Sequence, residues 1–115
     1  MALQIGLEQI TATIASGTSL SPATGLGAKT LVGIAMPAGW DAASLTFQIS
    51  IDGGTTWLEM AAFSAGIVAS ASNFISVDPT YWRGLNNIKV RSGTSGAAVN
   101  QTADRVLTLL VRPIA

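Results

Sequence analysis

Residues 44–57 read SLTFQISIDGGTTW, and this stretch decides the fold class. Its first half alternates strictly, with Leu45, Phe47, Ile49 and Ile51 separated by polar side chains. A period of two places these apolar residues on one face of a β-strand. The Asp-Gly-Gly sequence that follows permits positive φ angles and therefore a tight reversal. The stretch predicts a β-hairpin with one face in a hydrophobic core.

The same period of two recurs along the chain, and no window of a dozen residues shows a helical stripe. We expect seven or eight antiparallel strands, drawn from the segments 9–15, 30–36, 44–52, 56–63, 67–71, 73–77, 87–92 and 105–113. Short strands separated by turn residues are typical of an all-β sandwich or jelly roll. The length favours a single domain over residues 1–115, with residues 1–9 as an N-terminal arm. The one helical candidate is the turn DPTYWRG at 78–84.

Two of the expected strands are apolar on both faces. In TLVGIAM, strict alternation separates the apolar side chains into two sets, Val32, Ile34 and Met36 against Leu31 and Ala35. The segment RVLTLLV at 105–111 is apolar almost throughout. A strand with two apolar faces must be covered twice. Either a neighbouring subunit or a long loop of the same chain supplies the second cover.

The composition indicates contact with other protein. Only 10% of the residues are charged, against about 25% in an ordinary soluble domain. Hydrophobic residues make up 49%, and the mean hydropathy is +0.48. Every apolar run is shorter than the roughly 20 residues that cross a bilayer, so no membrane span is expected. The start, MALQIGLEQITA, lacks the basic residue of a signal peptide. We therefore expect oligomerisation or assembly.

The net charge is zero, but the charges are unevenly distributed. Residues 1–79 hold five carboxylates and one lysine, whereas residues 80–115 hold five basic residues and one aspartate. Two interpretations fit this asymmetry. Either strands of opposite sign pair within one fold, or complementary faces direct head-to-tail contact between subunits. Neither provides the basic, aromatic-rich surface that nucleic acid requires, so we predict no nucleic-acid partner.

The residue types argue against enzyme chemistry. The chain has no cysteine and no histidine, which removes the usual nucleophilic thiolate, the commonest general base and the commonest metal ligands. Asp52 and Glu59 flank one hairpin and form the best candidate for a glycosidase-like pair, but no third polar group accompanies them. Lys29 and Lys89 have no serine placed for activation. We predict no enzymatic activity, no metal and no cofactor.

The turn of the hairpin fits the pattern S-x-D-x-G-x-T-W, which resembles the Asp-box found on β-hairpins of sialidase-type propellers and of unrelated β-proteins. The residues concerned are Ser50, Asp52, Gly53, Gly54, Thr56 and Trp57. In those families the box usually lies away from the active site, and a propeller needs several copies where this chain has one. The resemblance therefore implies a structural hairpin, in which Asp52 accepts bonds from turn amides and the Trp57 indole covers the turn.

Two turns carry aromatic residues suited to recognition. MPAGWD at 36–41 places Trp40 in a Pro-Gly turn, and DPTYWRG places Tyr81 and Trp82 beside Arg83. Such rings serve as anchors of protein interfaces or as platforms for sugars. Alternatively, each ring folds under its own turn and seals the edge of the core. The sequence leaves these interpretations open.

Three segments together resemble a known group of proteins. They are MPAGWDAASLTFQISIDGGTTWLEM at 36–60, SVDPTYWRG at 76–84 and IKVRSGTSGAAVNQTADRVLTLLVRP at 88–113. They are similar to small β-sandwich proteins of tailed bacteriophages that are encoded among the virion structural genes. The resemblance rests on the hairpin box, the Asp-Pro turn and the phrase RSGTS followed by VNQTADR.

The resemblance implies a capsid decoration, or cement, protein on the virion surface, made in the host cytoplasm. Its expected partners are a second copy of the chain, as a dimer or trimer, and the major capsid protein. Contacts are expected from the arm at 1–9, from the long polar loops and from a set of candidate interface residues, namely Trp40, Tyr81, Trp82, Arg83, Arg91 and Arg105. The alternatives are a tail structural protein and a carbohydrate-binding or host-adhesion module.

Overall fold

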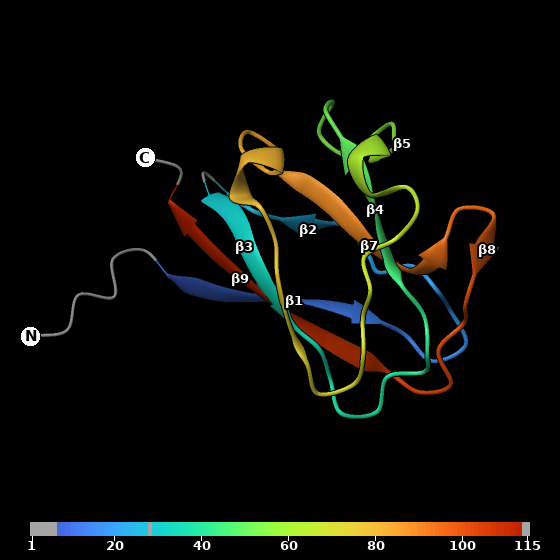
Figure 1. Ribbon diagram of the computed structural model, residues 1–115. Helices are drawn as coiled ribbons and strands as arrows, with labels where there is room; N and C mark the ends of the chain where they lie inside the picture. The colour runs from blue at the N-terminus through green and yellow to red at the C-terminus, as the bar shows by residue number, and fades with distance from the viewer. Residues whose placement is uncertain (1–6, 28, 114–115) are drawn as a thin grey trace, which may run out of the picture.

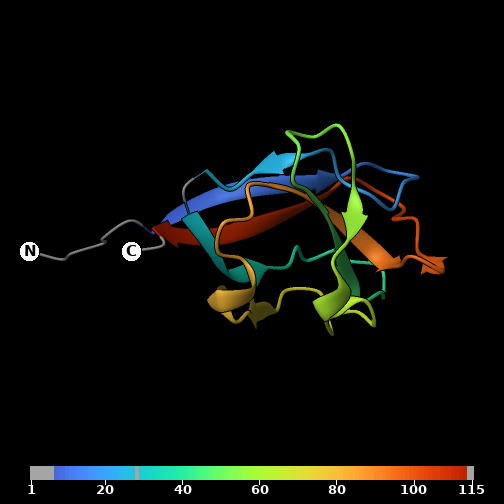
Figure 2. The ribbon, with the colours of Figure 1, turned by 90° about the horizontal axis from the view of Figure 1, so that it is seen from above.

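The computed structural model describes residues 7–27 and 29–113, and it confirms an all-β, sandwich-like domain (Figure 1). One antiparallel sheet has the strand order β1-β9-β3-β6. Its members are β1 (Glu8–Ile14), β9 (Arg105–Pro113), β3 (Lys29–Ala35) and β6 (Phe74–Ser76). The central strand β9 pairs with β1 on one side and with β3 on the other. The last strand of the chain thus lies between two early ones, and Figure 2 shows β1 and β9 side by side.

The second sheet has the order β2-β7-β4-β5. Its strands are β2 (Thr24–Gly25), β7 (Asn87–Thr94), β4 (Leu45–Ser50) and β5 (Leu58–Glu59), with β8 (Ala97–Ala98) paired to the end of β7. Two short 3₁₀ helices complete the described chain, η1 (Ala61–Phe63) and η2 (Pro79–Tyr81). The helix η2 lies in the DPTYWRG turn, where Asp78 caps it by accepting from the Thr80 amide.

The strand predictions agree with the structure except at short elements. The described residues contain nine strands rather than seven or eight, because the two-residue strands β2 and β8 are too short to show a period. Segment 67–71 is not a strand, since it contributes only a bridge from Ile67 to Leu45. Segment 56–63 shrinks to β5, and η1 then turns Phe63 toward the core.

The core lies between the inner faces of the two sheets. In the first sheet, Ile34 pairs with Leu109 and Ile75. In the second, Phe47 is fully buried, and the fully buried Trp82 packs edge-on against it, with ring centroids 4.8 Å apart at 87°. Such aromatic pairs contribute about 0.5–1.5 kcal/mol beyond the area they bury. Aromatic contact therefore seals the core beneath η2.

The alternation that predicted β4 ends one residue early. Leu45 and Phe47 are fully buried and Ile49 is nearly so, as expected, but Ile51 is 81% exposed. Ile51 belongs to the turn rather than to the strand, because pairing with β7 ends at Ser50. The expectation that Ile51 lies on the core face is therefore wrong.

A β-bulge accounts for the two apolar faces of β3. Leu31 pairs with Val111, but the next pair joins Gly33 to Leu110, so Val32 is the extra residue. The bulge brings Leu31 onto the same face as Ile34, and both are fully buried. The ring of Phe74 covers the outer side of Gly33, where a Cβ atom would lie 2.1 Å from the ring. The same chain therefore supplies the second cover of β3, for which the alternation of its apolar residues required a neighbouring subunit or a long loop.

The strand β9 alternates more cleanly than its sequence suggests. Leu107, Leu109 and Val111 are fully buried in the core. On the opposite face Val106 is 47% exposed and Leu110 is half-buried. This outer face therefore presents apolar side chains that no element of the described chain covers completely.

The predicted N-terminal arm falls partly outside the described residues. Residues 1–6 are not described, and Glu8 and Gln9 already belong to β1. Among the described residues, the structure has no helix with the length and apolar character that crossing a bilayer would require.

The bulge in β3 predicts which truncations damage the core. Leu31→Ala and Ile34→Ala should each lower the free energy of unfolding by about 2–5 kcal/mol, because both remove fully buried side chains. Val32→Ala should cost about 1 kcal/mol or less, since the bulged side chain is only half-buried. Urea denaturation of the three variants measures this. A larger loss of unfolding free energy in Val32→Ala than in Leu31→Ala would indicate strict alternation along β3 and contradict the bulge.

Candidate functional site

The hairpin at residues 50–57, here called the Asp-box hairpin, is held by one carboxylate and one hydroxyl. Oδ1 of Asp52 accepts from the amides of Thr55 (3.1 Å) and Thr56 (2.8 Å) and from Oγ of Ser50 (2.8 Å). Oγ of Ser50 in turn accepts from the Gly54 amide at 2.7 Å. These bonds satisfy turn amides that no strand pairs. The Asp52 carboxylate therefore organises the turn.

Hydrogen bonding also fixes the protonation state of this carboxylate. The bonds donated by Thr56, with that from Ser50, lower the pKa of Asp52 from 3.8 to about 2. Gly53 and Gly54 adopt φ values of 77° and 97°, which side chains rarely tolerate. The Trp57 indole donates to the Gly54 carbonyl at 3.1 Å. The expected covering of the turn by Trp57 is thus present in the geometry.

A bidentate ion pair lies on the outer face of the second sheet. Two nitrogens of Arg91 donate to the two carboxylate oxygens of Glu59 at 2.6 and 2.7 Å. Gln48 donates to the same carboxylate at 2.9 Å, and Arg91 also donates to Oγ1 of Thr46 at 3.3 Å. Arg91 lowers the pKa of Glu59 to about 2 and has its own pKa raised by the pairing. The pair fastens β5 to β7 across β4.

Neither carboxylate is suited to acid catalysis. A glycosidase needs one carboxyl group whose pKa is raised toward neutrality, so that it can donate a proton. The pKa values of Asp52 and Glu59 are both lowered to about 2. Oδ1 of Asp52 and both oxygens of Glu59 accept bonds from structural donors. Within residues 7–27 and 29–113, no cluster of three carboxylates is placed to hold a metal ion. The geometry provides no acid–base pair at this hairpin.

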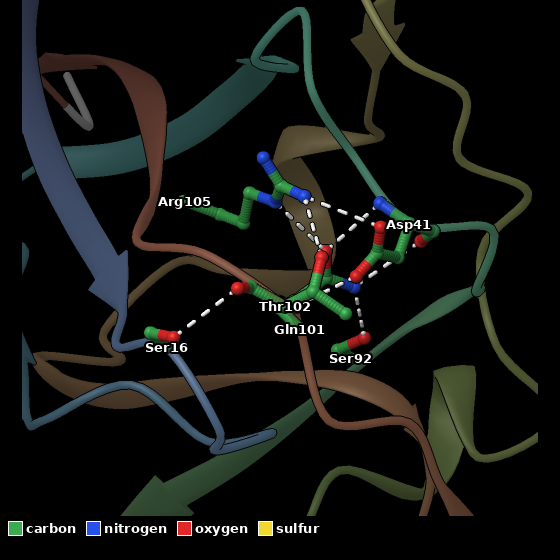
Figure 3. A network of polar contacts seen from close by, with 6 residues as sticks. All are labelled: Ser16, Asp41, Ser92, Gln101, Thr102 and Arg105. Carbon is green, nitrogen blue, oxygen red and sulfur yellow. Dashed lines mark hydrogen bonds and ion pairs between the residues drawn. The ribbon is translucent and has the colours of Figure 1, made fainter.

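A polar network joins three loops at one end of the sandwich (Figure 3). Its centre is Gln101, which is fully buried. The Gln101 side chain accepts from the Asp41 amide (2.9 Å) and from Nε of Arg105 (3.1 Å). It donates to the Asp41 carbonyl (3.1 Å) and to Oγ of Ser92 (2.8 Å). All four bonding positions of the amide are filled, as a buried side chain of this type requires.

Charged groups extend the network toward the surface. Asp41 accepts from the Thr102 amide at 2.7 Å and pairs with Arg105 at 3.2 Å. The bond from Thr102, followed by those from Arg105, lowers the pKa of Asp41. The Ser16 hydroxyl donates to the Thr102 carbonyl at 3.2 Å, and its amide donates to Asp104 at 2.8 Å. The loops around residues 16, 41 and 102 are thereby joined to one another.

The sequence analysis singled out the segment that supplies much of this network, but it did not show that the segment forms a network. The phrase VNQTADR, on which the phage resemblance partly rests, contains Gln101, Thr102, Asp104 and Arg105. Nothing in the residue types marks Gln101 as buried, because glutamine is usually exposed. Its partners lie 60 residues away at Asp41 and 9 away at Ser92. Only the fold brings them together.

The candidate interface residues do not form one surface. Trp40 and Trp82 are 7% and 0% exposed, so both belong to the core, which is one of the alternatives the sequence left open. Arg91, a candidate interface residue, is only 7% exposed, because Glu59 and Thr46 hold it. Arg105 is likewise folded into the loop network. Contacts within the chain therefore hold all four of these side chains.

The remaining two candidates stay accessible. Tyr81 is 52% exposed and packs edge-on against Phe63, with ring centroids 5.3 Å apart. Arg83 is exposed in the same turn. They lie beside η2, separated from the polar network in sequence and in bonding partners. Of the six predicted interface residues, only this adjacent pair is therefore presented to solvent.

Ion pairing favours the first interpretation of the charge asymmetry. Two pairs, Glu59 with Arg91 and Asp41 with Arg105, join the acidic part of the chain to the basic part. A third pair, Glu8 with Lys29, lies within the acidic part. Lys89 lies over the Trp57 ring, 4.5 Å from its centroid. Contacts within the fold therefore pair many of the charges that are unevenly distributed along the sequence.

A cleft of about 340 Å³ lies between the Asp-box hairpin and the turn at 84–87. Its lining includes Ser50, Ile51, Asn86 and Asn87, and it contains no ionisable side chain. Asn86 already accepts from the Gly27 amide at 2.9 Å. The cleft therefore offers no group for acid–base chemistry.

Comparisons of the chain with protein-family models, with curated proteins and with solved structures find no match.

Removal of the hairpin carboxylate should destabilise the protein in a pH-dependent way. We expect Asp52→Ala to lower the melting temperature at pH 7, because the amides of Thr55 and Thr56 lose their acceptor. The folded pKa of Asp52 lies below 3.8, so its stabilising effect is present above about pH 4 and is lost as the pH falls toward 2. Melting curves of both proteins should converge over that range.

Thr55→Ala is the matched control for this variant, since it keeps the backbone and removes an exposed side chain. Its melting temperature should follow the wild type at every pH. A constant difference between wild type and Asp52→Ala from pH 7 to pH 2 would show that the carboxylate charge is not what holds the turn.

Removal of one partner of the Glu59–Arg91 pair should also destabilise the fold. Glu59→Gln should lower the free energy of unfolding by about 1–3 kcal/mol, because the buried Arg91 keeps its charge and loses its bidentate partner. Glu8→Gln breaks a more exposed pair and should change stability by less than about 0.5 kcal/mol. Denaturant titrations of the two variants at pH 7 provide the measurement. Equal losses of unfolding free energy in the two variants would contradict the expected difference between the two ion pairs.

Proposed function

We propose that this protein is a structural component of a bacteriophage particle, a capsid decoration protein that binds the lattice of the major capsid protein. The resemblance of three sequence segments to small virion proteins points to the particle. The observation that carries the proposal is a part of the outer face of the sheet β1-β9-β3-β6, here called the uncharged face, that has no charged side chain. That face is suited to contact with another protein surface.

Next to the uncharged face, the row of Thr30 and Arg112 places an exposed arginine on the outer side of the same sheet. The uncharged face itself consists of three rows of side chains set by the strand register. They are Gln9, Leu110, Gly33 and Ser76, then Thr11, Thr108, Ala35 and Phe74, then Thr13 and Val106. None of these ten residues is charged, although Phe74 is 56% and Val106 is 47% exposed. Charged residues are depleted at the centres of protein interfaces, where apolar and aromatic side chains are enriched.

The second sheet has the opposite character. Its outer face carries Gln48, Glu59, Lys89 and Arg91, which are tied into an ion pair, hydrogen bonds and a cation–π contact. Polar groups that already have partners within the chain gain little from a further protein partner. The contrast between the two faces favours docking through the uncharged one.

Lattice binding suits a face of this kind. A face without charged side chains forms few strong polar contacts, so a single copy binds weakly. Repeated copies on a lattice, or an oligomer that engages several capsid subunits at once, convert weak contacts into stable attachment. A rigid fold without disulfides, closed by internal ion pairs and a fully bonded glutamine, is consistent with a permanent particle component.

The alternative of a carbohydrate-binding module loses its main support. It required Trp40 and Trp82 as exposed ring platforms, and both rings are buried. Tyr81 remains exposed, but its ring packs edge-on against Phe63. Sugar-binding sites stack the sugar on an open aromatic face. The geometry therefore favours protein contact over glycan recognition.

Co-sedimentation tests the proposal. Purified protein is mixed with capsids assembled from the major capsid protein encoded in the same phage genome. Wild type should sediment with the capsids, and Val106→Asp should weaken binding by at least about tenfold, because a charge replaces an exposed apolar side chain of the uncharged face. Absence of wild-type binding would contradict the proposed function.

Leu58→Asp is the matched control. Leu58 is 54% exposed on β5 of the other sheet, close to the 47% of Val106. This variant should bind capsids as wild type does. Equal weakening in both variants, or weakening at Leu58 alone, would show that the uncharged face is not the docking surface.

A further inference from the structure

The sheet edges of this fold are protected except for one. The four edge strands are β1, β6, β2 and β5. Three of them contain only two or three residues, whereas β1 contains seven. Short edge strands are one of the ways in which proteins prevent pairing with other chains. Among the edge strands of the described residues, β1 therefore offers a further strand the longest template.

The strand β1 also lacks the other protective features. Its sequence, EQITATI, contains no lysine and no proline, and its register with β9 runs without a bulge from Glu8 to Ile14. Among the described residues, β9 is its only strand partner, and no other backbone group bonds to residues 8–14. The outward-pointing amides and carbonyls of this edge form a row of unused donors and acceptors.

We infer that β1 pairs antiparallel with β1 of a second copy of this chain, about a two-fold axis that passes beside Thr11. The two four-stranded sheets then form one continuous eight-stranded sheet. An isologous contact of this type needs only one self-complementary edge, which the structure provides. Strand addition at a free sheet edge is a common mode of protein recognition.

The register follows from the alternation of β1. Centred on Thr11, the pairing sets Thr11 against Thr11, Gln9 against Thr13 and Ile10 against Ala12 of the second copy. Each of these pairs joins outer-face to outer-face or core-face to core-face residues, so both cores lie on the same side of the joined sheet. Threonine pairs opposite each other on antiparallel strands are favourable.

The charges are compatible with self-pairing in this register. Glu8 is the one charged residue of β1, and it lies opposite the apolar Ile14 of the second copy. Glu8 is paired with Lys29 and Arg105 with Asp41 within each chain. The register therefore brings no like charges face to face. A strand with charges along its length would lack this property.

The dimer would double the uncharged face described above, because both outer faces lie on the same side of the eight-stranded sheet. It is nevertheless a property of the chain alone and does not depend on capsid binding. Failure of the dimer and failure of the proposed function are measured separately, the first with purified protein and the second with capsids.

Single cysteines test the pairing directly, because the chain contains no cysteine of its own. Directly opposed residues of antiparallel strands have Cα atoms about 4.5–5.5 Å apart, within the range that a disulfide spans. Thr11→Cys should therefore form a disulfide-linked dimer under mild oxidation in air, of twice the 11.7 kDa chain mass. Non-reducing gel electrophoresis and mass spectrometry detect it.

Gln9→Cys is the matched control, since Gln9 is also exposed on the outer face of β1. In the inferred register the two Gln9 residues of a dimer are four positions apart along the strand, about 13 Å, which is too far for a disulfide. This variant should stay monomeric on the gel. A mixture of Gln9→Cys and Thr13→Cys chains should cross-link, because these positions face each other.

Sedimentation of the unmodified protein completes the test. Wild type should sediment as a dimer, and Thr11→Lys should sediment as a monomer with an unchanged circular dichroism spectrum, because two lysines would meet at the axis. The inference is overturned if wild type is monomeric and Thr11→Cys does not cross-link. It is equally overturned if Gln9→Cys cross-links as readily as Thr11→Cys, since the contact would then lie elsewhere.

Discussion

The turns and loops of the fold depend on its carboxylates, because each of the six acidic side chains hydrogen-bonds or ion-pairs with another group of the chain. Three form ion pairs and three accept bonds from backbone amides in turns or loops, the residues being Glu8, Asp41 and Glu59, and Asp52, Asp78 and Asp104. In a chain with 10% charged residues, the acidic groups thus serve contacts within the fold. They also tie together segments that are distant in sequence, such as the loops at Asp41 and Thr102.

This internal use of charge shapes the surface. The second sheet keeps charged groups on its outer face, where they bond to one another, and most of the outer face of the first sheet carries threonine, small and apolar side chains, with Arg112 at one end. The exposed Val106 and Phe74 on that face are of the kind that protein contacts bury. Together with the long free edge of β1, they make the first sheet the side of the molecule suited to assembly. The proposed decoration function and the inferred dimer both use this sheet.

The hairpin and most strands were predictable because their signals are local. Alternation at Leu45, Phe47 and Ile49 and the Asp-Gly-Gly turn act within a few residues, and the structure follows them. The bulge at Val32 was not predictable, because it depends on the register with β9, which follows 70 residues later. The burial of Arg91 was missed for the same reason, since its partner Glu59 arrives from another strand.

The sequence by itself determined the all-β class, the Asp-box hairpin and the scarcity of charge, since period, turn residues and composition are properties of short segments or of the whole count. Only the tertiary structure decided which side chains reach the surface. Trp40, Trp82 and Arg91 have the residue types of recognition sites, yet packing and pairing across the sheets remove them from solvent. The edge of β1 became available because strand order, which arises from long-range pairing, placed β9 on one side of it and no described strand on the other.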